Sequence, residues 1–228
     1  MNNLILIHGA LGTADQMSPL KEMLKKDFNV HLLELEGHGA SSSNEKAFAI
    51  DGFVNQLDDF IDSIGGTHIF GYSMGGFIAL LSAASGNPNI QSITTLGTKM
   101  KWSSEIAEQE VKHLNPEKIK EKVPAFAQAL KKKHGVHWEQ VLYRTAAFMK
   151  ALGDEPPITE SRMKQINIPV QLCLADKDQM VSKEETEEVN AWIPNSRFHF
   201  IPDSKHPIEQ TNLTTLAETV RSFMPSIS

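Results

Sequence analysis

The chain of 228 residues has little of what marks several large classes of protein. A single cysteine, Cys173, allows no disulfide framework and suits a reducing cytoplasm. No apolar run approaches the ~20 residues that a membrane-spanning helix needs. The formal net charge of −6 provides no basic surface for nucleic acid. We therefore expect a cytoplasmic protein whose partners include neither a membrane nor nucleic acid.

Targeting and metal signals are also missing. Residues 1–8 have no basic residue ahead of a four-residue apolar run, so they predict a core strand and not a signal peptide. The histidines lack the spacing of a metal site, and neither a G-x-G-x-x-G nor a P-loop pattern occurs. No metal and no cofactor are therefore expected. The apolar content of 40% is enough for the core of one compact domain.

Short apolar runs alternate with helical patterns along most of the chain. Such alternation predicts an α/β protein with a parallel sheet covered by helices on both faces, and functional groups gather at the carboxyl ends of its strands. The expected strands are Leu4–Ile7, Asn29–Leu35, His68–Phe70, Ser92–Leu96, Val170–Leu174 and Arg197–Ile201. The expected helices between them are Asp15–Lys26, Ile50–Ile64, Gly75–Ala84, Lys183–Trp192 and Leu213–Phe223.

One stretch, from Lys99 to Gln165, interrupts this alternation because it contains no convincing strand pattern. Lys131, Lys132 and Lys133 within it indicate a solvated helix end, with a phosphate or coenzyme A contact as the alternative. The helices expected in this stretch are Ser103–His113, Pro116–His134 and Trp138–Gly153.

The most informative segment is Gly71-Tyr72-Ser73-Met74-Gly75, which follows a short apolar run and precedes a helical pattern. This order predicts a strand, a sharp turn and a helix, with Ser73 exposed at the turn. Glycines on both sides give the pinched serine backbone its room. The amides at the start of the helix would stabilise negative charge at the same place. The pattern therefore predicts Ser73 as a nucleophile.

A serine hydroxyl needs a base within hydrogen-bond reach, and the base needs an acid to orient it. Of the nine histidines, three follow the carboxyl ends of expected strands, namely His8, His38 and His206. Two carboxylates, Asp176 and Asp178, follow the expected strand Val170–Leu174. Position alone leaves these alternatives open.

Four segments in this order make the chain resemble an α/β hydrolase along nearly its whole length. The resemblance implies an α/β-hydrolase fold, with a mostly parallel sheet of about six strands, helices on both faces and a helical cap. It places the core in residues 1–98 and 166–228 and the cap in residues 99–165, over a buried, medium-sized pocket. The segments are His8 to Gly12, Gly37 to Ser41, Gly71 to Gly76, and Asp178 followed by His206.

The resemblance also implies a role for individual residues. The family base follows the last strand, as His206 does, and His8 is then a structural hydrogen-bonding residue. The family pattern Gly-x-x-Asp-x-x-Val selects Asp178 over Asp176, although Ala175 replaces the usual glycine. The backbone amides of the oxyanion hole would come from Met74, the residue after the nucleophile, and from Ala10, with Leu11 as the alternative to Ala10. We expect no catalytic role for His38.

The expected reaction is acyl transfer through an acyl-enzyme, with a carboxylic ester of a small, partly apolar molecule as the substrate and a thioester or lactone as variants. One alternative is a C–C hydrolase or a lyase of the kind that acts in menaquinone synthesis. In that lyase an arginine usually follows the second glycine, where this chain has Phe77. The other alternative is a ligand receptor of the same fold that does not turn over its ligand.

Overall fold

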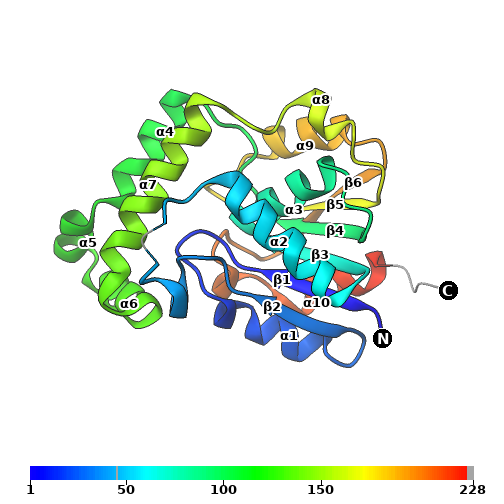
Figure 1. Ribbon diagram of the computed structural model, residues 1–228, viewed down its shortest axis with the longest axis horizontal. Helices are drawn as coiled ribbons and strands as arrows, with labels where there is room; N and C mark the ends of the chain where they lie inside the picture. The colour runs from blue at the N-terminus through cyan, green and yellow to red at the C-terminus, as the bar shows by residue number, and fades with distance from the viewer. Residues whose placement is uncertain (45, 225–228) are drawn as a thin grey trace.

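The computed structural model describes residues 1–44 and 46–224, and its centre is a sheet of six parallel strands in the order β2-β1-β3-β4-β5-β6 (Figure 1). All six expected strands are present. The second expected strand ends early, at Leu33, because the amide of Leu35 donates to the ring of His8 and not to a neighbouring strand. The strands are β1 (Asn3–Ile7), β2 (Asn29–Leu33), β3 (Thr67–Tyr72), β4 (Ile90–Leu96), β5 (Val170–Ala175) and β6 (Ser196–Ile201).

Helices cover both faces of this sheet, as the alternating pattern predicts. Successive strand side chains point to opposite faces. Leu4 and Leu6 therefore pack with α1 (Ser18–Leu24) and α10 (Leu213–Phe223) on one side. Ile5 and Ile7 pack in a second cluster on the other side. The helices of that side are α2 (Ile50–Ile64), α3 (Met74–Ala84), α8 (Glu160–Met163) and α9 (Lys183–Trp192).

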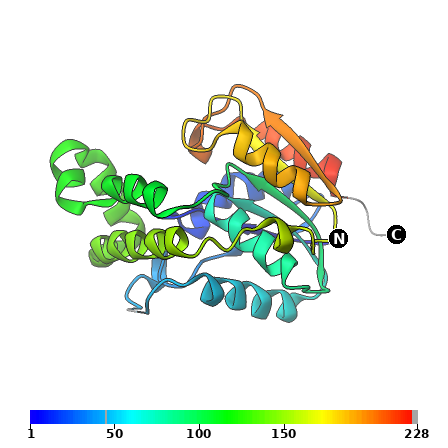
Figure 2. The same cartoon turned by 90° about the horizontal axis from the view of Figure 1, so that it is seen from above.

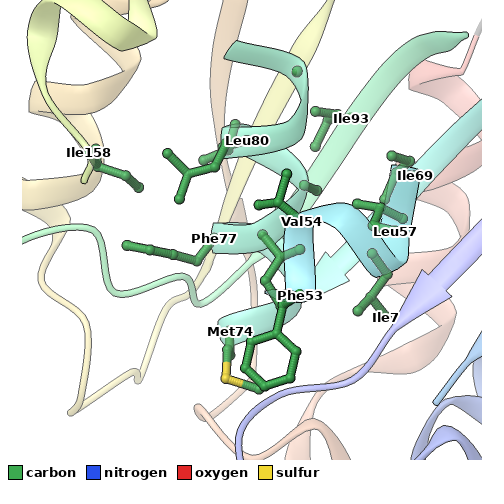
Figure 3. Packing of buried hydrophobic residues seen from close by; sticks show 14 of the residues in the cluster. Ile7, Phe53, Val54, Leu57, Ile69, Met74, Phe77, Leu80, Ile93 and Ile158 are labelled. Atoms are coloured by element: carbon green, nitrogen blue, oxygen red, sulfur yellow. The ribbon is translucent and has the colours of Figure 1, made fainter. Parts of the chain in front are cut away.

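Figure 3 shows part of this second cluster, where Phe53, Val54 and Leu57 of α2 lie beside side chains of α3 and of the sheet. Helix α3 is apolar on all sides, and its residues from Met74 to Ala83 are buried. A helix of this kind belongs inside a protein because it has no polar face for water. The burial of α3 fixes the position of the turn that precedes it.

Five α-helices stand between β4 and β5, and the first four form what we call the helical insertion, residues Ser104–Asp154. They lie at one end of the molecule, and Figure 2 shows them extending away from the sheet. They enclose a small apolar cluster of their own around Leu130, Trp138 and Leu142. Their bounds are α4 (Ser104–Val111), α5 (Pro116–Lys122), α6 (Pro124–His134) and α7 (Trp138–Asp154).

The insertion differs from the sequence prediction at one point, because the single helix expected over Pro116–His134 is two helices. The chain leaves the helical conformation at Val123, with φ −137° and ψ 60°. The ring of Pro124 disfavours the helical conformation for the residue before it. The prediction of a single helix did not take this effect into account. Helix α8 was not predicted, and it packs against α3 and α9 although it lies within residues 99–165.

None of the helices in the described ranges is both long and apolar enough to cross a membrane. Short 3-10 turns complete the fold. The 3-10 turns are Ala14–Met17, Gly39–Ser41, Lys112–Leu114, Gly135–His137 and Ile208–Gln210.

Candidate active site

Ser73 lies at the turn between β3 and α3, in the strand–turn–helix arrangement that the sequence predicts. Its backbone has φ 51° and ψ −116°, in the left-handed range that residues with a side chain rarely adopt. Its amide donates to Leu96 of β4 (2.8 Å), and its carbonyl accepts from Thr98 Oγ1 (3.1 Å). Strain of this kind persists only where the surroundings impose it, and it is concentrated at functional sites.

The glycines around Ser73 are required by close backbone contacts. A Cβ atom at Gly71 would lie 2.4 Å from the Cα atom of Gly76, within the turn itself. A Cβ atom at Gly75 would lie 2.6 Å from the carbonyl oxygen of Ile7 in β1. Both neighbours are backbone atoms that cannot rotate away. The tight turn that exposes Ser73 therefore depends on glycine at both positions.

Asp178 and His206 form a hydrogen-bonded pair beyond the ends of β5 and β6. His206 Nδ1 lies 2.8 Å from Asp178 Oδ2, and the two side chains are only 9% and 1% exposed. The other carboxylate oxygen, Oδ1, accepts from the amides of Met180 (2.8 Å) and Val181 (2.9 Å). These contacts fix the carboxylate so that it holds the ring of His206 in one orientation.

The pKa of Asp178 lies below its ordinary value. Burial alone raises the pKa of a carboxyl group, but here the hydrogen bond and charge of His206 and the amides of Val181 and Met180 outweigh it. Asp178 is therefore ionised at neutral pH. An ionised acceptor favours the tautomer in which His206 carries its proton on Nδ1 and leaves Nε2 free to act as a base.

The neighbouring carboxylate, Asp176, has a different place. Its Oδ1 accepts from the amide of Ser204 at 2.9 Å, and this bond lowers the pKa of Asp176 more than any other contact. Asp176 is exposed and ties the loop after β5 to the loop after β6. The structure thus brings Asp178, and not Asp176, to the histidine.

Ser73 and His206 line one cavity at the carboxyl end of the sheet. Within residues 1–44 and 46–224 no direct hydrogen bond joins the Ser73 hydroxyl to the His206 ring. Such bonds are often long without substrate and shorten when it binds. The cavity brings together residues that are more than 130 positions apart in the chain.

The two amides expected to form an oxyanion hole belong to residues of the same cavity. Ala10 follows β1, Met74 is the first residue of α3, and both line the space beside Ser73. In the described part of the chain neither amide nitrogen donates a hydrogen bond to another protein group. Leu11, the alternative to Ala10, does not line this cavity and has a positive φ of 59°.

The loop that carries Ala10 is supported by histidines. His8 Nδ1 donates to the carbonyl oxygen of Gly9 (2.8 Å), and Nε2 accepts from the amide of Leu35 (3.0 Å). Burial, the largest effect, lowers the pKa of His8 to about 4 against the smaller opposing effect of the Gly9 bond. His8 is thus neutral and structural, as expected, and His38 lies behind it with ring centroids 5.1 Å apart.

Sequence reasoning missed one residue of this support, His134 at the end of α6. Its ring is buried, with Nε2 3.1 Å from the carbonyl oxygen of Leu11 and Nδ1 3.0 Å from the amide of Gly39. The amide of Gly39 can only donate, so Nδ1 accepts and Nε2 carries the proton. A lone histidine within a helical pattern carries no signal for contacts so distant in sequence.

The walls of the cavity are mainly apolar. They include Phe77, Trp102, Phe148 and Leu152. The space left for a water-sized group is about 60 Å³, smaller than the medium-sized pocket expected. Aromatic side chains among its lining residues account for the difference, because the number that meet at the site depends on packing that the sequence does not display.

Two charged residues also line this cavity and join the helical insertion to the sheet. Lys99, in the loop after β4, lies 3.4 Å from Glu110 of α4 and donates to the carbonyl oxygen of Met180 at 3.2 Å. Both side chains are about one-fifth exposed. Their opposite charges leave the cavity without a net charge of its own.

No cluster of three or more histidine, cysteine, aspartate or glutamate side chains within the described ranges could hold a metal ion. Cys173 lies in the middle of β5 and is 1% exposed. Burial raises the pKa of its thiol to about 12, and the nearby charge of Arg197 offsets only part of this effect. A thiol this far from ionisation is not a nucleophile.

Known proteins resemble this chain in sequence and in fold. The chain is 28% identical over 229 residues to Lipase 3 of Moraxella sp. (strain TA144), covering 89% of this chain and 71% of that protein. NosK from Streptomyces actuosus has a similar structure (TM-score 0.81, 18% identity), with 97% of this chain and 96% of that chain covered. So does a thermophilic esterase from Thermogutta terrifontis (TM-score 0.78, 18% identity; 97% and 89% covered).

At these identities the two solved structures support the fold alone. The family model of the α/β hydrolase fold, however, matches residues 2–150, which is more than half of the chain and includes Ala10 and Ser73. The chain therefore belongs to the α/β hydrolase fold family.

Proposed function

We propose that this protein is a serine hydrolase that cleaves a carboxylic ester of a small, partly apolar molecule, with thioesters and lactones as related substrates. The observation that carries the proposal is the strained backbone of Ser73 above a cavity that it shares with the paired His206. Lipase 3 of Moraxella, whose match covers 89% of this chain, supports a hydrolase of this kind.

In the proposed reaction the Ser73 hydroxyl attacks the ester carbonyl while His206 Nε2 takes its proton. Asp178 stabilises the imidazolium that results, because its carboxylate accepts from Nδ1 at 2.8 Å. The amides of Ala10 and Met74 donate to the oxyanion of the tetrahedral intermediate, and losing one such donor typically costs ~3 kcal/mol. His206 then returns the proton to the leaving alcohol, and an acyl-enzyme remains.

Water completes the cycle. His206 takes a proton from a water molecule, whose oxygen attacks the acyl carbon and forms a second tetrahedral intermediate. The bond to Ser73 then breaks, Ser73 recovers its proton from His206, and the carboxylic acid leaves. We propose that residues 99–165 act as the cap that shields these steps from bulk solvent. The location in the cytoplasm stays a prediction of the sequence.

The direct test is Ser73→Ala, assayed with p-nitrophenyl acetate and butyrate. We expect kcat to fall by about 10⁴-fold or more, while the circular dichroism spectrum stays that of the wild type. Ser85→Ala, at the other end of α3, is the matched control and should keep its activity. Full activity of the Ser73 variant in a clean preparation would mean that Ser73 is not the nucleophile.

Fluorophosphonate labelling separates the alternatives. An esterase should be labelled at Ser73 and should also hydrolyse the esters. Labelling at Ser73 without ester turnover would favour the lyase or C–C hydrolase, or a receptor of the same fold. For the lyase, Phe77 is unfavourable, because it is 3% exposed and gives the cavity an apolar wall where an arginine would bind a carboxylate.

A further inference from the structure

Two cavities of very different size lie on either side of two residues of α7. The inner cavity holds Ser73 and leaves about 60 Å³. The outer cavity leaves about 540 Å³ and lies between the start of α2, the end of α7 and the segment that leads to α8. Phe148 and Leu152 line both cavities. These two side chains therefore form a wall between the inner and outer space.

The wall is well supported. Phe148 and Leu152 are four positions apart, so they point to the same side of α7. They are 3% and 4% exposed and belong to the main apolar cluster. The ring of Phe148 meets that of Phe53 edge to face, with centroids 5.7 Å apart. A wall packed in this way does not give way easily to a ligand.

The wall lies on the side of the site away from the base. His206 packs against Tyr72, which belongs to the cluster of α1 and α10, whereas Phe148 and Leu152 belong to the cluster of α2 and α3. In the proposed reaction the leaving alcohol lies beside His206, since that residue returns a proton to it. The acyl group then points the other way, toward Phe77 and the wall.

Resting on the proposed function, we propose that Phe148 and Leu152 limit the enzyme to short acyl groups, and that removing either side chain opens the acyl site into the outer cavity. The inner volume of about 60 Å³ is only a few times the roughly 10–15 Å³ that one water molecule needs, so it admits a short acyl group of a few atoms. The outer cavity is nine times larger and would hold the rest of a longer chain.

The test is kcat/KM for p-nitrophenyl esters from acetate to octanoate. For the wild type we expect a fall of at least about tenfold between acetate and octanoate. Phe148→Ala and Leu152→Ala should each raise the octanoate-to-acetate ratio by about tenfold or more, since a single methylene changes discrimination by that order. If either alanine variant fails to fold, Phe148→Leu replaces it, with a smaller shift expected.

Ile50→Ala is the matched control, because Ile50 lines the outer cavity and not the inner one. Its ratio should equal that of the wild type. The proposal that Phe148 and Leu152 limit chain length is wrong if kcat/KM of the wild type does not change with chain length. It is also wrong if the octanoate-to-acetate ratio is unchanged in the Phe148 and Leu152 variants, or if Ile50→Ala shifts that ratio equally.

A binding measurement distinguishes failure of the wall from failure of the esterase. Octanoate and acetate are added separately to each protein, and the melting temperature is followed. Octanoate should stabilise the wall variants and not the wild type. If no protein hydrolyses any ester but octanoate still stabilises only the wall variants, the wall stands and the proposed reaction is wrong. Equal stabilisation of all proteins would overturn the wall.

Discussion

His134 Nε2 lies 3.1 Å from the carbonyl oxygen of Leu11, across 123 positions of sequence. This bond joins the end of α6 to the loop that presents the amide of Ala10. The other ring nitrogen of His134 accepts from Gly39, so one side chain fixes two loops at once. We therefore propose that the helical insertion helps to position the amide of Ala10, which we assign to the proposed oxyanion hole.

Replacing His134 tests this relationship. His134→Ala leaves the carbonyl of Leu11 and the amide of Gly39 without their partner, so the free energy of unfolding should fall by about 2–4 kcal/mol. If the bond positions the amide of Ala10, kcat for p-nitrophenyl acetate should fall about tenfold while KM changes little. His134→Gln keeps a donor and an acceptor and should recover part of kcat. Equal kcat values in all three proteins would show a structural role only.

The choice between the two carboxylates gives a second prediction. Asp178→Asn removes the charge that stabilises the His206 imidazolium, and we expect kcat to fall by about 10³–10⁴-fold. Asp176→Asn keeps an acceptor for the amide of Ser204 and should change kcat less than threefold. The measurement is a pair of steady-state assays on proteins of equal purity. If Asp176→Asn, and not Asp178→Asn, loses most of its kcat, the assignment of Asp178 as the acid is wrong.

The strain at Ser73 predicts a variant that loses activity and gains stability. Ser73→Gly abolishes the nucleophile but relieves the positive φ, so we expect the free energy of unfolding to rise by about 1 kcal/mol in urea titrations. Ser85→Gly is the matched control, because Ser85 has an ordinary φ of −79°. That variant should lose about 0.5–1 kcal/mol. If Ser73→Gly is less stable than the wild type, the backbone conformation of Ser73 does not cost stability as we expect.

The buried neutral state of His8 predicts a dependence of stability on pH. Its pKa is lowered from 6.5 to about 4, so the unfolded chain takes up a proton first as the pH falls. The contribution of His8 to stability is therefore complete above pH 6.5 and is lost between pH 6.5 and 4. The loss corresponds to about 3 kcal/mol. The pKa values of His38 and His134 are lowered in the same direction.

Urea titrations from pH 7 to 4 on the wild type and His8→Gln measure this loss. Carboxylates also titrate at the acid end of this range, so the informative quantity is the difference between the two proteins. The glutamine variant should be less stable at pH 7 and should lose less stability on acidification. Parallel curves for the two proteins would show that His8 does not titrate in this range.

The sheet and the turn at Ser73 could be predicted from local signals, whereas Asp178 and His206 were selected from their alternatives only by the resemblance to α/β hydrolases. Apolar runs mark the strands, and the glycines around Ser73 have no other local explanation than a tight turn. The interruption of the helix at Val123 could also be predicted from a local signal, because Pro124 disfavours the helical conformation of the residue before it.

The wall and the His134 bond could not be predicted in this way. Helical periodicity shows that Phe148 and Leu152 share a face, but not that this face separates two cavities. Phe148 contacts Phe53 of α2, nearly a hundred positions earlier in the chain, and no local pattern encodes that contact. The size of the active-site cavity depends on the same packing, which is why the pocket predicted from the sequence was too large.

Cys173 gives all these variants a ready chemical reporter. It is the only thiol in the chain, and it lies 1% exposed on β5 between two neighbouring strands. A thiol-reactive dye can modify it only when the sheet opens, so the labelling rate in native buffer measures how often that happens. The stability of each variant can thus be ranked without denaturant, by counting modified molecules over time.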